Sequence, residues 1–97
     1  MSDTEKTAEE PKPLSVYDLI AFSMDQFSEV AWQKMGLRPD PMTGKQDTNL
    51  PEAKVAIDMA SRLAEILDPQ LDDEDRRQVQ ARLSDLRINF VRKSGDA

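Results

Sequence analysis

The stretch LPEAKVAIDMASRLAEIL, residues 50–67, decides the fold of this chain. Its apolar residues recur every three or four positions, which is the period of an α-helix. They form two stripes, the first made of Ala53, Ala56, Ile57, Ala60, Leu63, Ala64 and Leu67 and the second of Val55, Met59 and Ile66. A helix that is apolar over more than half of its circumference packs on two sides. We therefore expect a central helix here, with alanines that let neighbouring helices approach closely.

Signals for the start and the end of a helix flank this stretch. Asn49 and Glu52 form a capping-box pair at its beginning. Asp68 precedes Pro69, and the residue before a proline is pushed out of the helical region of backbone space. The sequence therefore predicts that this helix covers residues 50–67.

An earlier amphipathic segment predicts a helix over residues 15–35. Ser15 is suited to cap its N-terminus, and Gly36 can take the left-handed conformation that ends it. One wide face carries Val16, Leu19, Ile20, Ser23, Met24, Phe27, Val30 and Ala31. Phe22 and Trp32 lie off that face. Either the helix boundaries or a tilt bring these two side chains into the core, or they form a second contact surface.

A third helix is predicted over residues 72–92. Asp72 is its expected N-cap, and the acids that follow complement the positive end of the helix dipole. One stripe carries Val79, Leu83, Leu86 and Phe90, and two further apolar residues, Ile88 and Val91, lie outside it.

The connector between the second and third predicted helices is short, so we expect these helices to form an antiparallel hairpin. If residues at equal distances before and after residue 70 lie opposite each other in this hairpin, with residue 70 as the mirror point, then Asp58 lies near Arg82 and Glu52 lies near Arg87. The predicted fold class is therefore all-α.

The expected domain organisation is simple. Residues 14–93 form a single helical domain of three helices. Residues 1–13 are acidic and contain two prolines but no large apolar side chain after Met1, so they cannot bury enough surface to offset the entropy of ordering. We expect a disordered tail there and a flexible C-terminus over residues 94–97.

The chain contains no histidine and no cysteine. It therefore lacks the most common general base, any thiol nucleophile and any thiolate metal ligand. The consecutive acids at positions 72–75 would point in different directions around a helix, so they cannot chelate one ion. We expect no catalytic residue, no cofactor-binding residue and no metal ligand, and we expect that the protein is not an enzyme.

The net charge is −6, which argues against a nucleic-acid partner because phosphate contacts require clustered Lys and Arg. Arg76 and Arg77 directly follow four acids, a pattern typical of a solvated helix face. No stretch approaches the ~18 apolar residues of a membrane span, and residues 1–5 lack the features of a secretory signal. We expect no nucleic acid and no membrane among the partners, and a cytoplasmic location.

The segment 37–48 connects the first two predicted helices and is longer than a helical bundle requires. Its polar residues are a candidate ligand site, which consists of Arg38, Asp40, Thr43 and Lys45. Gly36 and Gly44 superficially resemble the glycines of a phosphate-binding loop, but seven residues separate them instead of four. Gln46 also stands where such a loop needs Ser or Thr, so a turn-rich connector explains the segment better.

Several short motifs, in this order, resemble a bacterial family catalogued as domain of unknown function 1844. They are Met35-Gly36-Leu37, Pro39-x-Pro41-x-Thr43-Gly44, Leu50-x-x-Ala53-Lys54-x-x-Ile57-Asp58 and Leu83-x-x-Leu86-Arg87-x-x-Phe90-Val91. The resemblance covers about residues 15–91, and the chain departs from the family pattern at residues 67–71. It implies a small cytoplasmic helical protein and supplies no activity and no catalytic residues.

Two functions remain open. The leading one is a non-catalytic module for protein–protein interaction or self-association, including a homodimer, and the other is a small-ligand-binding or enzyme-accessory domain that uses the 37–48 loop. The candidate interface residues are Phe22, Trp32, Val55, Met59, Ile66, Ile88 and Val91. One surface patch containing Phe22, Trp32, Met59 and Ile88 would favour a protein interface. A polar pocket beneath the loop would favour a ligand.

Overall fold

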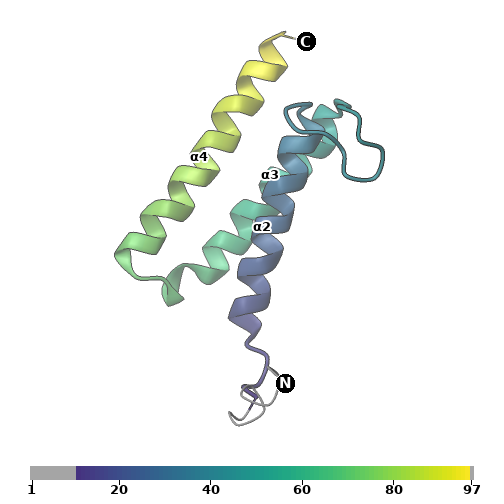
Figure 1. Ribbon diagram of the computed structural model, residues 1–97. Helices are drawn as coiled ribbons and strands as arrows, with labels where there is room; N and C mark the ends of the chain where they lie inside the picture. Colours follow the sequence, from purple (N-terminus) through teal and green to yellow (C-terminus); the bar gives the residue numbers. More distant parts are fainter. Residues whose placement is uncertain (1–10, 97) are drawn as a thin grey trace.

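The computed structural model describes residues 11–96 and consists of three α-helices. They are α2 (Val16–Lys34), α3 (Leu50–Leu67) and α4 (Asp73–Asp96), with a short 3-10 turn, η1 (Asp68–Gln70), between the last two. In Figure 1 the chain rises through α2, descends through α3 and rises again through α4. The predicted all-α class is confirmed. The expected tail over residues 1–13 lies mostly outside the described residues.

Polar side chains cap the three helices at the predicted positions. The N–H of Tyr17 donates to Ser15 Oγ at 3.2 Å, and the N–H of Glu52 donates to Asn49 Oδ1 at 3.1 Å. At the start of α4, the N–H of Asp75 donates to Asp72 Oδ1 at 2.8 Å. Each bond satisfies a backbone donor that has no partner inside its helix. The far end of α4 differs from the prediction, because the helix continues past residue 92 to Asp96.

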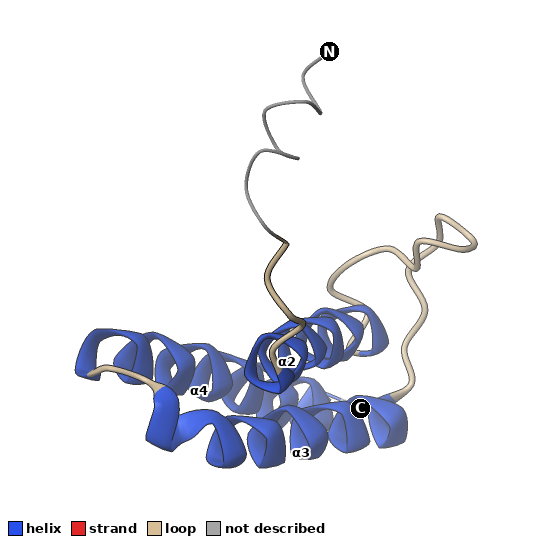
Figure 2. Cartoon of the chain, turned by 90° about the horizontal axis from the view of Figure 1, so that it is seen from below, coloured by secondary structure: helices blue, strands red, loops and turns tan. Residues whose placement is uncertain are grey.

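The end of α2 fixes where the chain turns back. Gly36 has a φ of 76°, and the N–H of Leu37 donates to the Trp32 carbonyl at 3.1 Å. An isolated antiparallel bridge then joins Met35 to Thr48 and closes the base of the connecting loop. The loop projects away from the helices (Figure 2). Because its base is closed, α3 starts directly beside the end of α2.

Alanines form the contact between α2 and α3. Ala31 of α2 and Ala53 and Ala60 of α3 are fully buried, and Ala56 and Ala64 are nearly so. The first predicted stripe of residues 50–67 is therefore confirmed as the buried side of α3. Small side chains at these positions bring the two helix backbones close together.

The predicted face of α2 is only partly buried. Met24 and Ala31 lie in the core as expected, but Val16, Leu19 and Val30 are exposed. Ser28 is buried instead, where its hydroxyl donates to the Met24 carbonyl at 2.8 Å. The wide apolar face of α2 thus contacts α3 along one edge and leaves the other edge to solvent.

Val79, Leu83 and Leu86 of α4 are buried as predicted, and Phe90 is partly buried. The predicted mirror point of the hairpin is wrong. Arg87 Nη2 donates to Ser61 Oγ at 2.6 Å, so residues 61 and 87 lie opposite each other. The residue midway between them is 74 and not 70.

The charged residues expected to pair between these helices bond elsewhere. Asp58 pairs with Lys54 on its own helix at 3.0 Å. Glu52 lies 3.4 Å from Lys34, and Arg82 reaches α2. The reason is local, because η1 adds a turn and Leu71 is extended before α4 begins. The chain therefore reverses its direction several residues later than a shorter connector would produce.

Arg76 binds the connector between α3 and α4. Its Nε donates to Asp68 Oδ1 at 2.9 Å, and its Nη2 donates to the carbonyls of Asp68 and Leu71 at 3.2 and 3.1 Å. A third nitrogen, Nη1, donates to Asp73 Oδ1 at 3.0 Å. The interpretation of this segment as a solvated charged face holds for Arg77, which is exposed beside Glu74, but not for Arg76, since its planar group joins both ends of the turn.

We expect Gly36→Ala to destabilise the protein more than Gly44→Ala. Both glycines have positive φ, which costs an L-residue about 1–2 kcal/mol. A Cβ on Gly36 would also clash with Thr48 Oγ1, whereas a Cβ on Gly44 meets nothing within 4 Å. The clash adds about 1–3 kcal/mol. Urea unfolding of both variants checks this difference, and equal losses would contradict the proposed role of the closed loop base.

Candidate functional site

The candidate interface residues lie in separate places on the molecule. Val55, Met59 and Ile66 lie on α3, Ile88 and Val91 lie on α4, and Phe22 is exposed on α2. Trp32 is partly buried against the core and lines a cleft on another side. The structure therefore does not gather Phe22, Trp32, Met59 and Ile88 into one patch.

The α3 residues of this set lie on the side of the helix that faces away from α4. The α4 side of α3 is marked by Ile57 and Ser61, since Ile57 lines a groove with Phe90 and Ser61 binds Arg87. Val55 is two residues from Ile57, which places it about 160° away around the helix. Val55 and Ile66 are 62% and 59% exposed.

The exposed edge of α2 faces the same way. Its α4 side is marked by Trp32, which lines a cleft with Leu86 of α4. Val30 is two residues from Trp32 and therefore also lies about 160° from it. Because α4 lies on one side of both helices, Val30 and Val55 belong to the opposite side of the molecule.

Together these residues form one surface, which we call the apolar face. It consists of Val16, Leu19, Ile20, Phe27 and Val30 of α2 and Val55, Met59, Leu63 and Ile66 of α3. Lys34 at the end of α2 pairs with Glu52 at the start of α3, which fixes the register of these antiparallel helices. Phe27 lies seven residues before Lys34 and Met59 seven residues after Glu52, so these two residues lie at the same height along the pair. None of the nine residues is charged. Their exposed fractions correspond to a summed solvent-accessible area on the order of 500 Å², comparable with the largest apolar patch on a typical monomer.

A smaller apolar groove lies between α3 and α4. Ile57, Phe90 and Val91 line it, together with the charged residues Lys54, Asp58 and Arg87. Its volume is about 280 Å³. Ile88 lies beside it on α4 and is 48% exposed. The groove is narrower and more charged than the apolar face.

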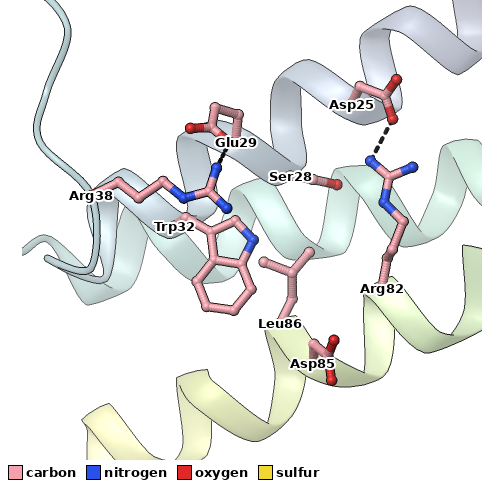
Figure 3. Close-up of a pocket in the computed structure, with 8 residues that line it drawn as sticks. All are labelled: Asp25, Ser28, Glu29, Trp32, Arg38, Arg82, Asp85 and Leu86. Carbon is pink, nitrogen blue, oxygen red and sulfur yellow. Dashed lines mark hydrogen bonds and ion pairs between the residues drawn. The ribbon is translucent and has the colours of Figure 1, made fainter.

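A polar cleft of about 330 Å³ lies between α2 and α4 (Figure 3). Arg82 Nη2 of α4 donates to Asp25 Oδ1 of α2 at 2.6 Å, which links the two helices. Arg38 forms an ion pair with Glu29 of α2. The Arg38 guanidinium carbon also lies 5.7 Å from the centre of the Trp32 ring, in the range of a cation–π contact.

The polar groups of this cleft largely bind one another. Both arginines are paired with carboxylates, and the Ser28 hydroxyl donates to a backbone carbonyl of its own helix. Over residues 11–96 the structure contains no cluster of three or more acidic side chains that could hold a metal ion. The cleft is therefore explained as a set of ion pairs that holds α4 and the loop against α2.

The four loop candidates do not form one site. Arg38 points into the polar cleft, whereas the other three bond within the loop. The N–H of Met42 donates to Asp40 Oδ1 at 2.7 Å, and the N–H of Lys45 donates to Thr43 Oγ1 at 3.2 Å. These short-range bonds are those of turns closed by side chains.

Two of the features above were missed from the sequence. Arg82 was expected to pair with Asp58 but reaches Asp25, because the position of α4 depends on the connector. Val16, Leu19 and Val30 share the predicted apolar face with the buried Met24 and Ala31, although α2 carries more apolar residues than one neighbouring helix can cover. That excess was the available signal for the apolar face.

Comparison with known proteins identifies one family. The family model described as domain of unknown function DUF1844 matches residues 18–92. No curated protein and no solved structure matches the chain. Among the described helices, none combines the length and the apolar character required to span a bilayer.

We expect Arg38→Ala to expose Trp32, the only tryptophan of the chain. The variant loses the guanidinium over the ring, with a stability loss of about 0.5–1 kcal/mol. Tryptophan emission should move to longer wavelength and be quenched more readily by acrylamide. Lys45→Ala, which removes the same charge from the same loop, should leave the emission unchanged. Identical spectra for Arg38→Ala and the unmodified protein would contradict the cleft geometry.

Proposed function

We propose a non-catalytic protein-interaction role for this chain, which belongs to the family described as domain of unknown function DUF1844. The single observation that carries the proposal is the apolar face, which combines nine uncharged residues from two adjacent helices. As part of the same proposal, the partner is a protein and not nucleic acid, and the protein acts in the cytoplasm.

Burial of the apolar face would be energetically favourable. Full burial of a Val, Leu or Ile side chain gains about 1.5–3 kcal/mol relative to exposure in water. Val16, Leu19, Val55 and Ile66 are each about half exposed, between 48% and 62%. A partner that covers them recovers part of that free energy at each position. The largest apolar patch of a soluble monomer, typically about 300–600 Å², is often a functional surface.

The other surfaces support a partner less well. The polar cleft is occupied by its own ion pairs, and the groove between α3 and α4 is bordered by the charged residues Lys54, Asp58 and Arg87. A ligand-binding role for the 37–48 loop has weaker support, because Asp40 and Thr43 are used to close turns within the loop.

We expect a paired substitution on the apolar face to abolish partner binding. Val55→Glu combined with Ile66→Glu places two charges at exposed positions, so the fold should persist while the face becomes polar. The matched control is Ile88→Glu combined with Val91→Glu, which changes two exposed apolar residues of α4 in the same way.

The measurement is quantitative co-purification of each tagged variant from native cells, with circular dichroism as the test of folding. The α4 variant should retain the proteins bound by the unmodified chain, and the α3 variant should lose at least nine-tenths of them, or about 1.4 kcal/mol of binding free energy. Equal retention by both variants would refute the assignment of the interface.

A further inference from the structure

We infer that the partner covering the apolar face is a second copy of this chain, so that α2 and α3 of two molecules form a four-helix core. This inference rests on the proposed function and specifies its partner.

Helix α2 carries two parallel rows of core-type residues. The first row contacts α3 and consists of Met24, Ser28, Ala31 and Met35, at intervals of four, three and four. The second row belongs to the apolar face, apart from Ser23, and consists of Val16, Ile20, Ser23, Phe27 and Val30, at intervals of four, three, four and three. This spacing is that of a helix packed along a partner helix. The second row is only partly covered within the chain, because Ile20 and Phe27 pack against the core at one edge whereas Val16 and Val30 are exposed.

Helix α3 repeats the arrangement. Its first row is buried and consists of Ala53, Ile57, Ala60, Ala64 and Leu67, again at intervals of four, three, four and three. Its second row lies on the apolar face and consists of Val55, Met59, Leu63 and Ile66. In a four-helix bundle each helix lies beside two neighbours and turns a wide apolar face toward the shared core. The pair formed by α2 and α3 thus has the pattern of half a bundle.

A second copy supplies the missing half with matching dimensions. Helices α2 and α3 contain 19 and 18 residues, so the face of one copy is as long as the face of another. A two-fold axis through the face would place each copy's rows on its partner and close the assembly at two chains. The apolar face presents on the order of 500 Å² of accessible surface, and the polar residues around it add to the area that a partner would bury. The total approaches the ~800 Å² that each partner buries in a standard interface.

The charge distribution permits this contact despite a net charge of −6 on each copy. None of the nine residues of the face is a carboxylate, and its borders carry Gln26 and Gln33 on α2, Arg62 on α3 and, at one end, Glu52 paired with Lys34. Acidic side chains such as Asp25 and Asp85 line the cleft on the α4 side. Like charges are therefore kept away from the proposed interface, where they would oppose association.

Sedimentation equilibrium of the full chain, from sub-micromolar to high micromolar concentration, tests the inference. We expect a species of twice 11.0 kDa for the unmodified protein. Val55→Glu combined with Ile66→Glu should raise the dimer dissociation constant at least a hundredfold while circular dichroism shows unchanged helicity. Ile88→Glu combined with Val91→Glu should leave the dissociation constant within threefold of the unmodified value.

Two results would overturn the inference. A monomer at every concentration would do so, and the proposed function would survive if the Val55 and Ile66 substitutions still removed a different protein in co-purification. A dimer that resists these substitutions but separates with the α4 pair would place the contact on α4. That second result would also remove the apolar face as the site of self-association.

Discussion

The close contact between α2 and α3 through alanine is the constraint on which the rest of the structure depends. Ala31 of α2 and Ala53 and Ala60 of α3 are fully buried in the core that these two helices share. Small residues at a helix contact allow the axes to approach the lower end of the usual range of separations, about 8 Å. Helix α2 must therefore end where α3 begins, which explains the left-handed Gly36 and the closed loop base.

A core built from alanine buries little apolar surface, and this has consequences for function. The largest fully buried side chains are Met35 and Leu86, while several larger apolar groups remain exposed on α2 and α3. Helix α4 covers only one side of the pair, and the ion pair between Arg82 and Asp25 helps to hold it there. Exposed ion pairs of this kind contribute only about 0–1 kcal/mol, so buried apolar contacts such as Leu86 do most to hold α4. The uncovered side is left for a partner.

The sequence predicted most of the fold because its signals were local. Caps at Ser15, Asn49 and Asp72 and the buried stripe of α3 depend only on neighbouring residues, and the structure contains them. The rotation of α2 and the partners of Arg82 depend on how helices are placed relative to each other, which periodicity alone does not specify. The second stripe of α3 was recognised, but its continuation onto α2 required the structure. Arg76 was misread because its partners are backbone carbonyls of the turn, which leave no sequence pattern.

The most direct test of the alanine contact is the stability of Ala60→Met compared with that of Ala81→Met. Ala60 of α3 is fully buried in the core, whereas Ala81 is exposed on α4. Methionine and alanine have similar helix propensities, so the control substitution should change the free energy of unfolding by less than about 0.5 kcal/mol. A larger side chain at position 60 must force the helices apart, at a cost of about 1–3 kcal/mol. Equal unfolding free energies for the two variants in urea titrations would contradict the close contact of α2 and α3.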